Sequence, residues 1–225
     1  MQEITQTHHE NKKHDFTLAE AFGFGWDRTK KYWAIMILIG AVHFMASLLF
    51  GFLIKFTGQT GEPTGNLSLA VSLINYIVYF WLAYNTMKMG LKMTSGHKVD
   101  IKELFHFDKT SAKKIGMYFL AISACSLVIF VGFILLIIPG IYFGVKYKFV
   151  PYLVLDKDMS IADAFKKSAN MTDGKIWKLL GVSFVYFGVA VAGFVALVFG
   201  IIPAAILITF TELFIYRKLA DGHVN

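Results

Sequence analysis

The sequence predicts an all-α, polytopic membrane protein with six transmembrane helices, and three observations support this fold class. Of the 225 residues, 56% are hydrophobic and only 16% are charged, whereas about 25% of the residues in a soluble domain are charged. The mean hydropathy is +0.57. The apolar residues also come in long blocks between lysine-rich polar segments. These properties argue against a soluble globular domain and exclude a disordered chain.

The first three apolar blocks are each long enough to cross a bilayer. Residues 33–54 carry no charge over 22 positions, which as a helix is about 33 Å against a hydrocarbon core of roughly 30 Å. Residues 67–87 and 115–138 are also uncharged. We expect the first block to be a retained helix and not a signal peptide. A long polar stretch precedes it, and no small-residue cleavage pattern follows it.

The other three blocks are shorter or interrupted by charges. They cover residues 141–155, 176–200 and 204–216. Pro139 and Pro203 stand shortly before the first and the last of them. Because proline lacks the N–H that a helix interior needs but suits a helix start, we expect a tight turn at each proline and six spans in total.

The basic residues predict the orientation. With six spans both termini lie on one side, and 19 of the 22 lysine and arginine residues fall on that side, against Lys55 alone on the other. The positive-inside rule then places both termini in the cytoplasm, for a multi-pass protein of the plasma membrane. The net charge of +7 needs no nucleic acid as a partner. Membrane lipids with anionic headgroups on the cytoplasmic side are the expected partners, and a second copy or another protein is left open.

Three polar segments share one pattern, in which a helix-capping residue is followed by a carboxylate three positions later and a phenylalanine five positions later. The three sets are Thr17, Glu20 and Phe22; Asp100, Glu103 and Phe105; and Ser160, Asp163 and Phe165. This capping-box pattern predicts a short amphipathic helix at the cytoplasmic surface before each pair of spans.

The chain is therefore expected to consist of a disordered cytoplasmic tail, residues 1–15, and a single six-helix membrane domain, residues 16–220. The domain would hold three repeat units, at about 16–94, 99–156 and 159–218. The last two units also align at an offset of 64, which matches residues 142–152 with 206–216. Because each unit has an even number of spans, the units would share one orientation about an axis along the membrane normal.

The second half of the chain carries a family resemblance, clearest over residues 137–181. This run contains a Pro-Gly turn at Pro139, then Pro151, Asp156, Ser160, Ala164, Ser168, Gly174 and Trp177. It resembles uncharacterised bacterial integral-membrane proteins related to the membrane domain of glycerophosphoryl diester phosphodiesterases. The shared residues are structural, so the resemblance implies a fold more than a function. In that family the phosphodiesterase domain is a separate soluble segment, and the resemblance does not imply an enzyme here.

Charged residues inside predicted spans mark the candidate functional site. Such charges cost roughly 2.5–3.5 kcal/mol each, so Lys146, Lys148 and Glu212, together with Asn75, form a candidate intramembrane polar site. Lys148 and Glu212 each follow a hairpin proline by nine positions and have opposite charges. Three interpretations are open: a salt bridge between helices four and six, a site for an anionic headgroup or a coupled ion, or two side chains that reach cytoplasmic water separately.

Two sets of small residues indicate close helix packing. The first set is Gly140 and Gly144, and the second is Gly188, Ala192, Ala196 and Gly200 at four-residue spacing. Small residues let helix backbones approach each other in lipid. We expect both sets to pack within the bundle, and a sliding or dimer face is the alternative.

The sequence predicts no catalytic, metal or cofactor site. A single cysteine rules out a disulfide framework and a multi-Cys zinc site, and no catalytic motif is present, so we expect no metal, no cofactor and no catalytic residues. The first interpretation is an integral plasma-membrane protein without enzymatic activity of its own, acting as a membrane accessory or lipid-associated scaffold. The alternative is a small transporter or lipid-translocating protein with a polar site between helices four and six.

Overall fold

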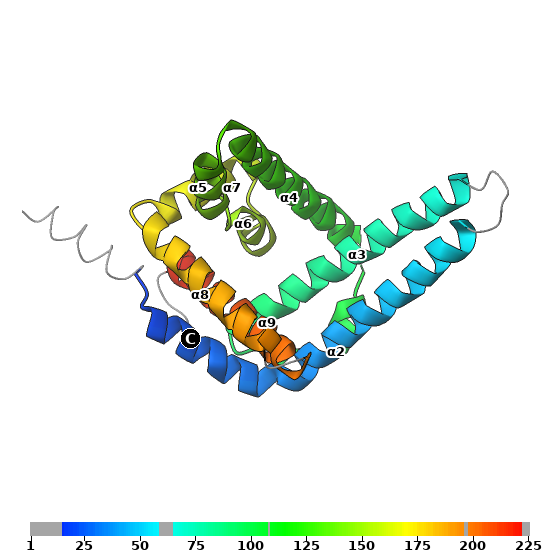
Figure 1. Ribbon diagram of the computed structural model, residues 1–225, viewed down its shortest axis with the longest axis horizontal. Helices are drawn as coiled ribbons and strands as arrows, with labels where there is room; N and C mark the ends of the chain where they lie inside the picture. Colours follow the sequence, from blue (N-terminus) through cyan, green and yellow to red (C-terminus); the bar gives the residue numbers. More distant parts are fainter. Residues whose placement is uncertain (1–14, 59–64, 108, 196–197, 222–225) are drawn as a thin grey trace, which may run out of the picture.

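The computed structural model describes residues 15–58, 65–107, 109–195 and 198–221, and every regular element in these ranges is helical. The predicted tail, apart from Asp15, lies outside them. The elements are α2 (Leu18–Gly58), α3 (Gly65–Thr94), the 3-10 helix η1 (Ile101–Phe105), α4 (Lys109–Leu135), α5 (Ile137–Lys146), α6 (Val150–Lys157), α7 (Ile161–Thr172), α8 (Ile176–Val195) and α9 (Val198–Asp221) (Figure 1). The predicted all-α class is confirmed.

In the part of the chain that the structure describes, five helices are long and apolar enough to cross a membrane: α2, α3, α4, α8 and α9. The six predicted spans are not confirmed, because residues 141–155 do not form a single fourth transmembrane helix. The chain runs instead through α5, of 10 residues, and α6, of 8 residues, which both pack against α4. Pro151 explains the break. In a continuous helix its ring would clash with the carbonyl of Tyr147, four residues earlier, and Tyr147 is the C-cap residue directly after α5.

The predicted turn at Pro203 is also displaced. α8 ends at Val195 and α9 begins at Val198, so Pro203 lies inside α9. Pro139 does lie in the first turn of α5, as expected. Glycines bring the two legs together near each of these turns. A Cβ added to Gly132 would lie 2.9 Å from the Gly140 Cα, and a Cβ added to Gly193 would lie 2.8 Å from the Gly200 carbonyl oxygen.

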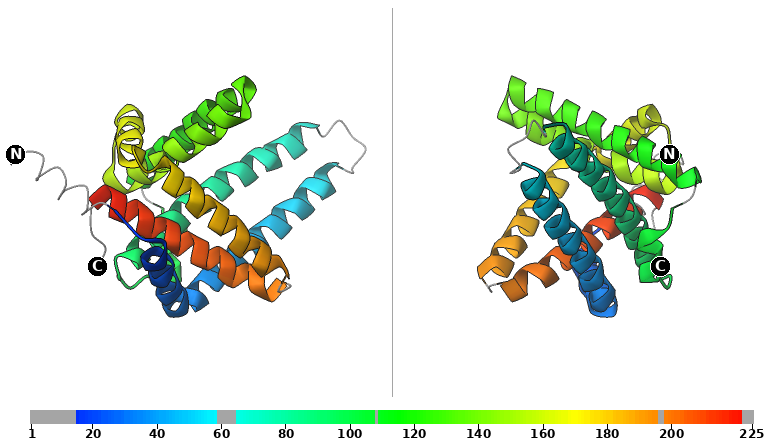
Figure 2. Two further views of the ribbon diagram at one scale, coloured as in Figure 1. Left: turned by 60° about the vertical axis from the view of Figure 1, so that its left-hand side comes forward. Right: turned by 90° about the vertical axis from the view of Figure 1, so that its right-hand side faces the viewer.

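Three hairpins, α2–α3, α4–α5 and α8–α9, fan apart from a common base (Figure 2). In this base the beginning of the described chain lies beside the last turns of α9 and the first turn of α8. Lys218 of α9 donates a hydrogen bond of 3.2 Å to Glu20 of α2, and Lys178 of α8 pairs with Asp15. The described chain therefore begins and ends on the same side of the fold.

The three capped segments take three different forms. Thr17 caps α2, which continues into the long apolar helix without a break, so no separate interfacial helix forms there. The second segment is η1, and the third is the separate helix α7. The capping bonds themselves form in all three. The Glu20 N–H donates to Thr17 Oγ1 at 3.1 Å, and the Asp163 N–H donates to Ser160 Oγ at 3.2 Å; Asp100 and Glu103 complete a full capping box.

The buried position of each capped segment lies four residues after the cap. Ala21, Leu104 and Ala164 occupy this position, and each is 0% exposed. The phenylalanine one position later packs against an aromatic ring in all three segments: Phe22 on Tyr186, Phe105 on Trp81 and Phe165 on Tyr147. Its burial differs, because Phe105 is 52% exposed whereas Phe22 and Phe165 are partly buried.

Charge also holds η1 in place. Burial alone would raise the pKa of Glu103. Hydrogen bonds from Lys92 and from the Asp100 N–H, together with the charges of Lys92 and Lys88, outweigh burial and hold this pKa below its ordinary value. Asn85 of α3 then donates to the Leu104 carbonyl oxygen at 3.0 Å. A carboxylate whose pKa is lowered on folding stabilises the fold at neutral pH, and this contribution is lost as the pH falls through the lowered pKa.

The contrast between Leu104 and Phe105 gives a stability prediction. Leu104→Ala should lower the free energy of unfolding in detergent by about 2–3 kcal/mol, since it removes a fully buried side chain. Phe105→Ala, one position later, should cost about 1 kcal/mol or less, because its ring is already half exposed. Thermal unfolding of the two variants measures both values. Equal losses would contradict the assignment of Leu104 as the anchor of η1.

α2 changes direction where it leaves the base (Figure 1). The Thr29 hydroxyl donates to the Gly25 carbonyl oxygen at 2.7 Å, a side-chain bond to the preceding turn that bends helices. At the same place α2 crosses α9 closely. A Cβ added to Gly25 would collide with the Thr211 hydroxyl oxygen and lie 3.2 Å from the Leu207 side chain. Gly25 is thus required for this crossing.

Gly25→Ala should therefore lower the free energy of unfolding by about 1–3 kcal/mol through overpacking. Gly23→Ala is the matched control, because a Cβ there meets nothing within 4 Å. That control should be neutral or slightly stabilising, since alanine favours a helix over glycine by about 1 kcal/mol. If both alanine variants are equally stable, the close crossing of α2 and α9 does not exist in solution.

Candidate functional site: a polar ladder between α6 and α9

Lys148 and Glu212 form an ion pair between the α5–α6 turn and α9. The Lys148 Nζ lies 2.8 Å from Glu212 Oε1 and 3.0 Å from Oε2. The two side chains are only 18% and 12% exposed. The Lys148 ammonium also lies over the rings of Phe149 and Tyr186, at 5.3 and 5.9 Å from their centroids. The geometry is that of the salt-bridge interpretation.

This ion pair is one of three contacts between residues 64 positions apart. Tyr152 stacks on Tyr216 with 5.2 Å between ring centroids, and the Lys157 Nζ lies 2.8 Å from Asp221 Oδ1. The six residues of the three pairs are named here the α6–α9 ladder. The sequence alignment of residues 142–152 with 206–216 has the same offset and covers the first two pairs, while Lys157 and Asp221 lie five positions beyond it. A constant offset means that the two segments run parallel at this place.

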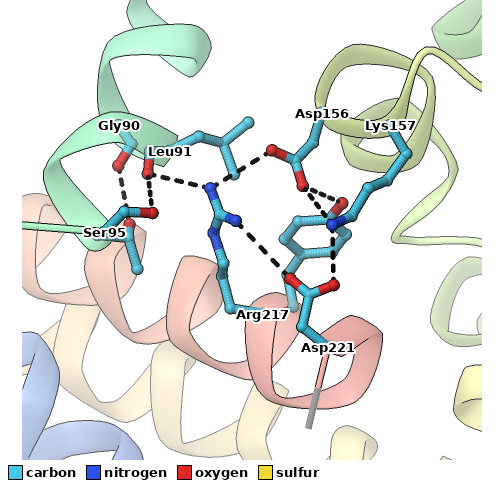
Figure 3. Close-up of polar contacts among 9 residues, drawn as sticks. Gly90, Leu91, Ser95, Asp156, Lys157, Arg217 and Asp221 are labelled. Atoms are coloured by element: carbon cyan, nitrogen blue, oxygen red, sulfur yellow. Dashed lines mark hydrogen bonds and ion pairs between the residues drawn. The ribbon is translucent and has the colours of Figure 1, made fainter. Parts of the chain in front are cut away.

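Arg217 ties α9 to α3 and α6 at the Asp221 end of the ladder (Figure 3). Its Nη2 donates to the Leu91 carbonyl oxygen of α3 at 3.3 Å and lies 3.4 Å from Asp156 Oδ1 of α6. Its Nη1 lies 3.7 Å from Asp221 Oδ2. The Tyr216 hydroxyl donates to the other Asp156 oxygen at 2.9 Å. One largely buried carboxylate therefore binds both an arginine and a tyrosine of α9.

α7 positions the turn that carries Lys148. The helix break leaves carbonyl groups of α5 without their helical partners, and such groups need other donors in a membrane protein. The hydroxyls of Ser168 and Thr172 both donate to the Lys146 carbonyl oxygen, at 2.9 and 3.3 Å. The Cys125 thiol lies 3.8 Å from the Tyr147 carbonyl oxygen. α4 and α7 thus stabilise the break from two sides.

The other two candidate residues lie elsewhere. Lys146 donates a hydrogen bond of 3.2 Å to the Tyr142 hydroxyl and lies over that ring. Asn75 lines a separate cavity between α2 and α3, together with Ser47. The four residues expected to form one polar site therefore do not gather, and only Lys148 and Glu212 come together.

The small residues are placed differently from the expectation. Gly140 packs against the Phe133 ring and Gly200 against Gly193, whereas Cβ atoms added to Gly144 and Gly188 would meet nothing within 4 Å. Ala192 is exposed, and the side chain of Ala196 lies outside the described residues. The four-residue stripe therefore does not pack within the bundle over Gly188 and Ala192. The buried small residue of α8 is Gly193, one position off the stripe.

Sequence reasoning missed Asp156, Arg217 and the two ladder tyrosines as site residues. Tyr152 and Tyr216 stand at matching ends of the aligned runs. Neither is charged, and the candidate site was chosen mainly from charged residues inside predicted spans. Arg217 was counted only as an orientation signal. The Tyr186 hydroxyl is also buried beside Glu212, close enough to interact electrostatically.

The chemistry of the ladder is that of charge neutralisation inside a helical bundle. Among the described residues, no three His, Cys, Asp or Glu side chains gather as metal ligands would. The ladder instead offers matched charges, stacked rings and hydroxyl donors. Comparisons with family models, with curated proteins and with solved structures find no match for the chain. The resemblance to the phosphodiesterase-related membrane domains therefore stays a prediction from the sequence.

Proposed function

We propose that this chain is an integral protein of the plasma membrane that acts as a membrane accessory or lipid-associated scaffold and has no enzymatic activity of its own. The observation that carries the proposal is the separation of apolar side chains, along the hairpins, from charged side chains, in the base. The three hairpins expose large apolar side chains along their outer lengths, as lipid-facing helices do. Buried charged groups, by contrast, are paired with one another inside the base, as in the Lys148–Glu212 pair and the Arg217 network.

The proposal includes a cytoplasmic base made of three repeat units. Three observations support it: the three capping sets, the buried residue four positions after each cap, and the α6–α9 ladder between residues 64 positions apart. The excess of basic residues in the segments that join the hairpins at the base supports a cytoplasmic orientation. Such a base would bind anionic headgroups, because each lysine or arginine near an anionic surface contributes about 1 kcal/mol.

Extraction of the tagged protein from cell membranes with its surrounding lipid, in polymer-bounded particles, tests the proposed function. The fraction of anionic phospholipid in these particles should be at least about twice that of the bulk membrane. A variant with Lys166→Gln and Lys167→Gln, two exposed positions on α7, should have a smaller enrichment. The bulk lipid composition around the unaltered protein would contradict a lipid-associated scaffold.

One observation favours the alternative of a small transporter or lipid-translocating protein. A helix broken beside a buried charge is the arrangement that many transporters use to bind ions, and the turn at Lys148 has this form. In liposomes, a transporter would conduct ions or flip lipid, and Glu212→Gln would stop that activity. The scaffold proposal predicts rates equal to those of protein-free liposomes for both the unaltered protein and the variant.

A further inference from the structure

An apolar groove of about 490 Å³ lies between α5 and α8. Its walls include Ile138, Ile141, Tyr142 and Val145 from α5, and Trp177 and Leu180 from α8. A volume between 300 and 1,000 Å³ is typical of sites that hold a small ligand. The groove is separate from the α6–α9 ladder, which uses none of these side chains.

The groove runs along the α8 helix from its first turn. Trp177, at the α8 end that lies in the base, is 85% exposed, which suits a ring in the headgroup region. Leu180 lies one turn further along α8, and Ile138 lies at the far end of α5 near the hairpin turn. A ligand in this groove would therefore reach from the membrane surface into the hydrocarbon layer.

A cationic group stands at the surface end of the groove. Lys146 bonds to the hydroxyl of the groove residue Tyr142, and in the described part of the chain it forms no salt bridge. Asp173 acts on Lys146 electrostatically. Lys178, in the first turn of α8, pairs with Asp15 instead. The Lys146 ammonium and the Tyr142 hydroxyl thus form the polar end of the groove.

We infer that the α5–α8 groove binds one anionic phospholipid, with an acyl chain between the two helices and the phosphate at Lys146 and Tyr142. The inference rests on the proposed lipid-associated function and gives it a defined site. An apolar groove with a cation and a hydroxyl at one end matches the shape and charge of such a lipid. A free phosphate would leave the apolar walls uncovered.

Photo-crosslinking in nanodiscs tests the site. The full chain is reconstituted in phosphatidylcholine with a small share of phosphatidylglycerol that carries a diazirine on one acyl chain. Cross-links should concentrate on Ile141 and Leu180, and a phosphatidylcholine probe should give about fivefold fewer. Lys146→Gln should lower the phosphatidylglycerol yield about fivefold, as expected for one basic contact. The control Lys166→Gln, on an exposed face of α7, should change the yield less than twofold.

Equal labelling by both probes would overturn the inference, and so would labelling spread evenly over outward residues such as Phe44 and Leu127. Displacement of the probe by soluble glycerol phosphate, or cross-links between two copies of the chain across the groove, would also overturn it. If anionic lipid is enriched in the polymer particles but Lys146→Gln leaves the cross-links unchanged, the groove assignment fails and the proposed function stands. If the enrichment itself is absent, the proposed function fails.

Discussion

Lys148→Met alone should lower the free energy of unfolding in detergent by about 3–5 kcal/mol, because it leaves the Glu212 carboxylate buried without its partner. The ion pair is 2.8 Å long and largely shielded from solvent. Glu212→Gln should cost a similar amount for the same reason, since it leaves the Lys148 ammonium buried without its partner. The double variant should be more stable than the sum of the two losses predicts, because no unpaired charge remains. A double-mutant cycle in thermal unfolding measures this coupling.

Two further variants sharpen the cycle. The swap Lys148→Glu with Glu212→Lys should recover much of the loss, because it restores opposite charges at the same two positions. Lys166→Met, an exposed lysine on α7, should change stability by about 0.5 kcal/mol or less. A coupling energy within about 0.5 kcal/mol of zero would mean that the two groups are solvated independently, and the ladder would lose its first pair.

Asp156→Asn should have the second large effect, also about 3–5 kcal/mol. Asp156 is the carboxylate that binds Arg217 and accepts the Tyr216 hydroxyl (Figure 3). Without its charge, Arg217 keeps only the Leu91 carbonyl and the longer contact to Asp221. Because Arg217 joins α9 to both α3 and α6, the cooperativity of unfolding should fall as well as the midpoint. Thermal unfolding followed by tryptophan fluorescence detects both changes.

Asp158→Asn is the matched control for this variant. Asp158 lies two residues further along and pairs with Lys114 at 2.7 Å, but its side chain is 62% exposed. An exposed ion pair contributes about 0–1 kcal/mol. Asparagine also tolerates the left-handed backbone that Asp158 adopts, with φ of 51°. Equal losses for the two variants would contradict the assignment of Asp156 as the centre of the network.

The sequence was sufficient for features that depend on local chemistry. The apolar blocks predicted five of the helices, and the three capping sets form their predicted bonds. The Lys148–Glu212 pair could be anticipated as one of three interpretations, because the repeat offset placed opposite charges at equivalent positions. The break after Lys146 also had a local signal in Pro151, whose ring excludes a continuous helix at Tyr147.

Features that depend on contacts between distant segments could not be predicted in the same way. Arg217 binds Leu91, 126 positions away, and no sequence period relates these residues. The crossing of α2 and α9 requires Gly25, because Thr211 and Leu207 of α9 leave no room for a side chain there. Pro203 lies inside α9 because the close contact of Gly193 with Gly200 places the turn before it. In each case contacts between helices, and not the conformational preference of a single residue, determine the local structure.

The most direct test of the account is the membrane topology of the three hairpins. Reporter fusions after Gly61 and Leu136 measure the compartment of the first two hairpin turns, and fusions after Asp158 and Asn225 measure the compartment of the base. The account predicts that Gly61 and Leu136 report the outer side, and that Asp158 and Asn225 report the cytoplasm, because α5 and α6 together return the chain to the base. Asp158 in the same compartment as Leu136, or Asn225 in the same compartment as Gly61, would contradict three hairpins rooted on one cytoplasmic base.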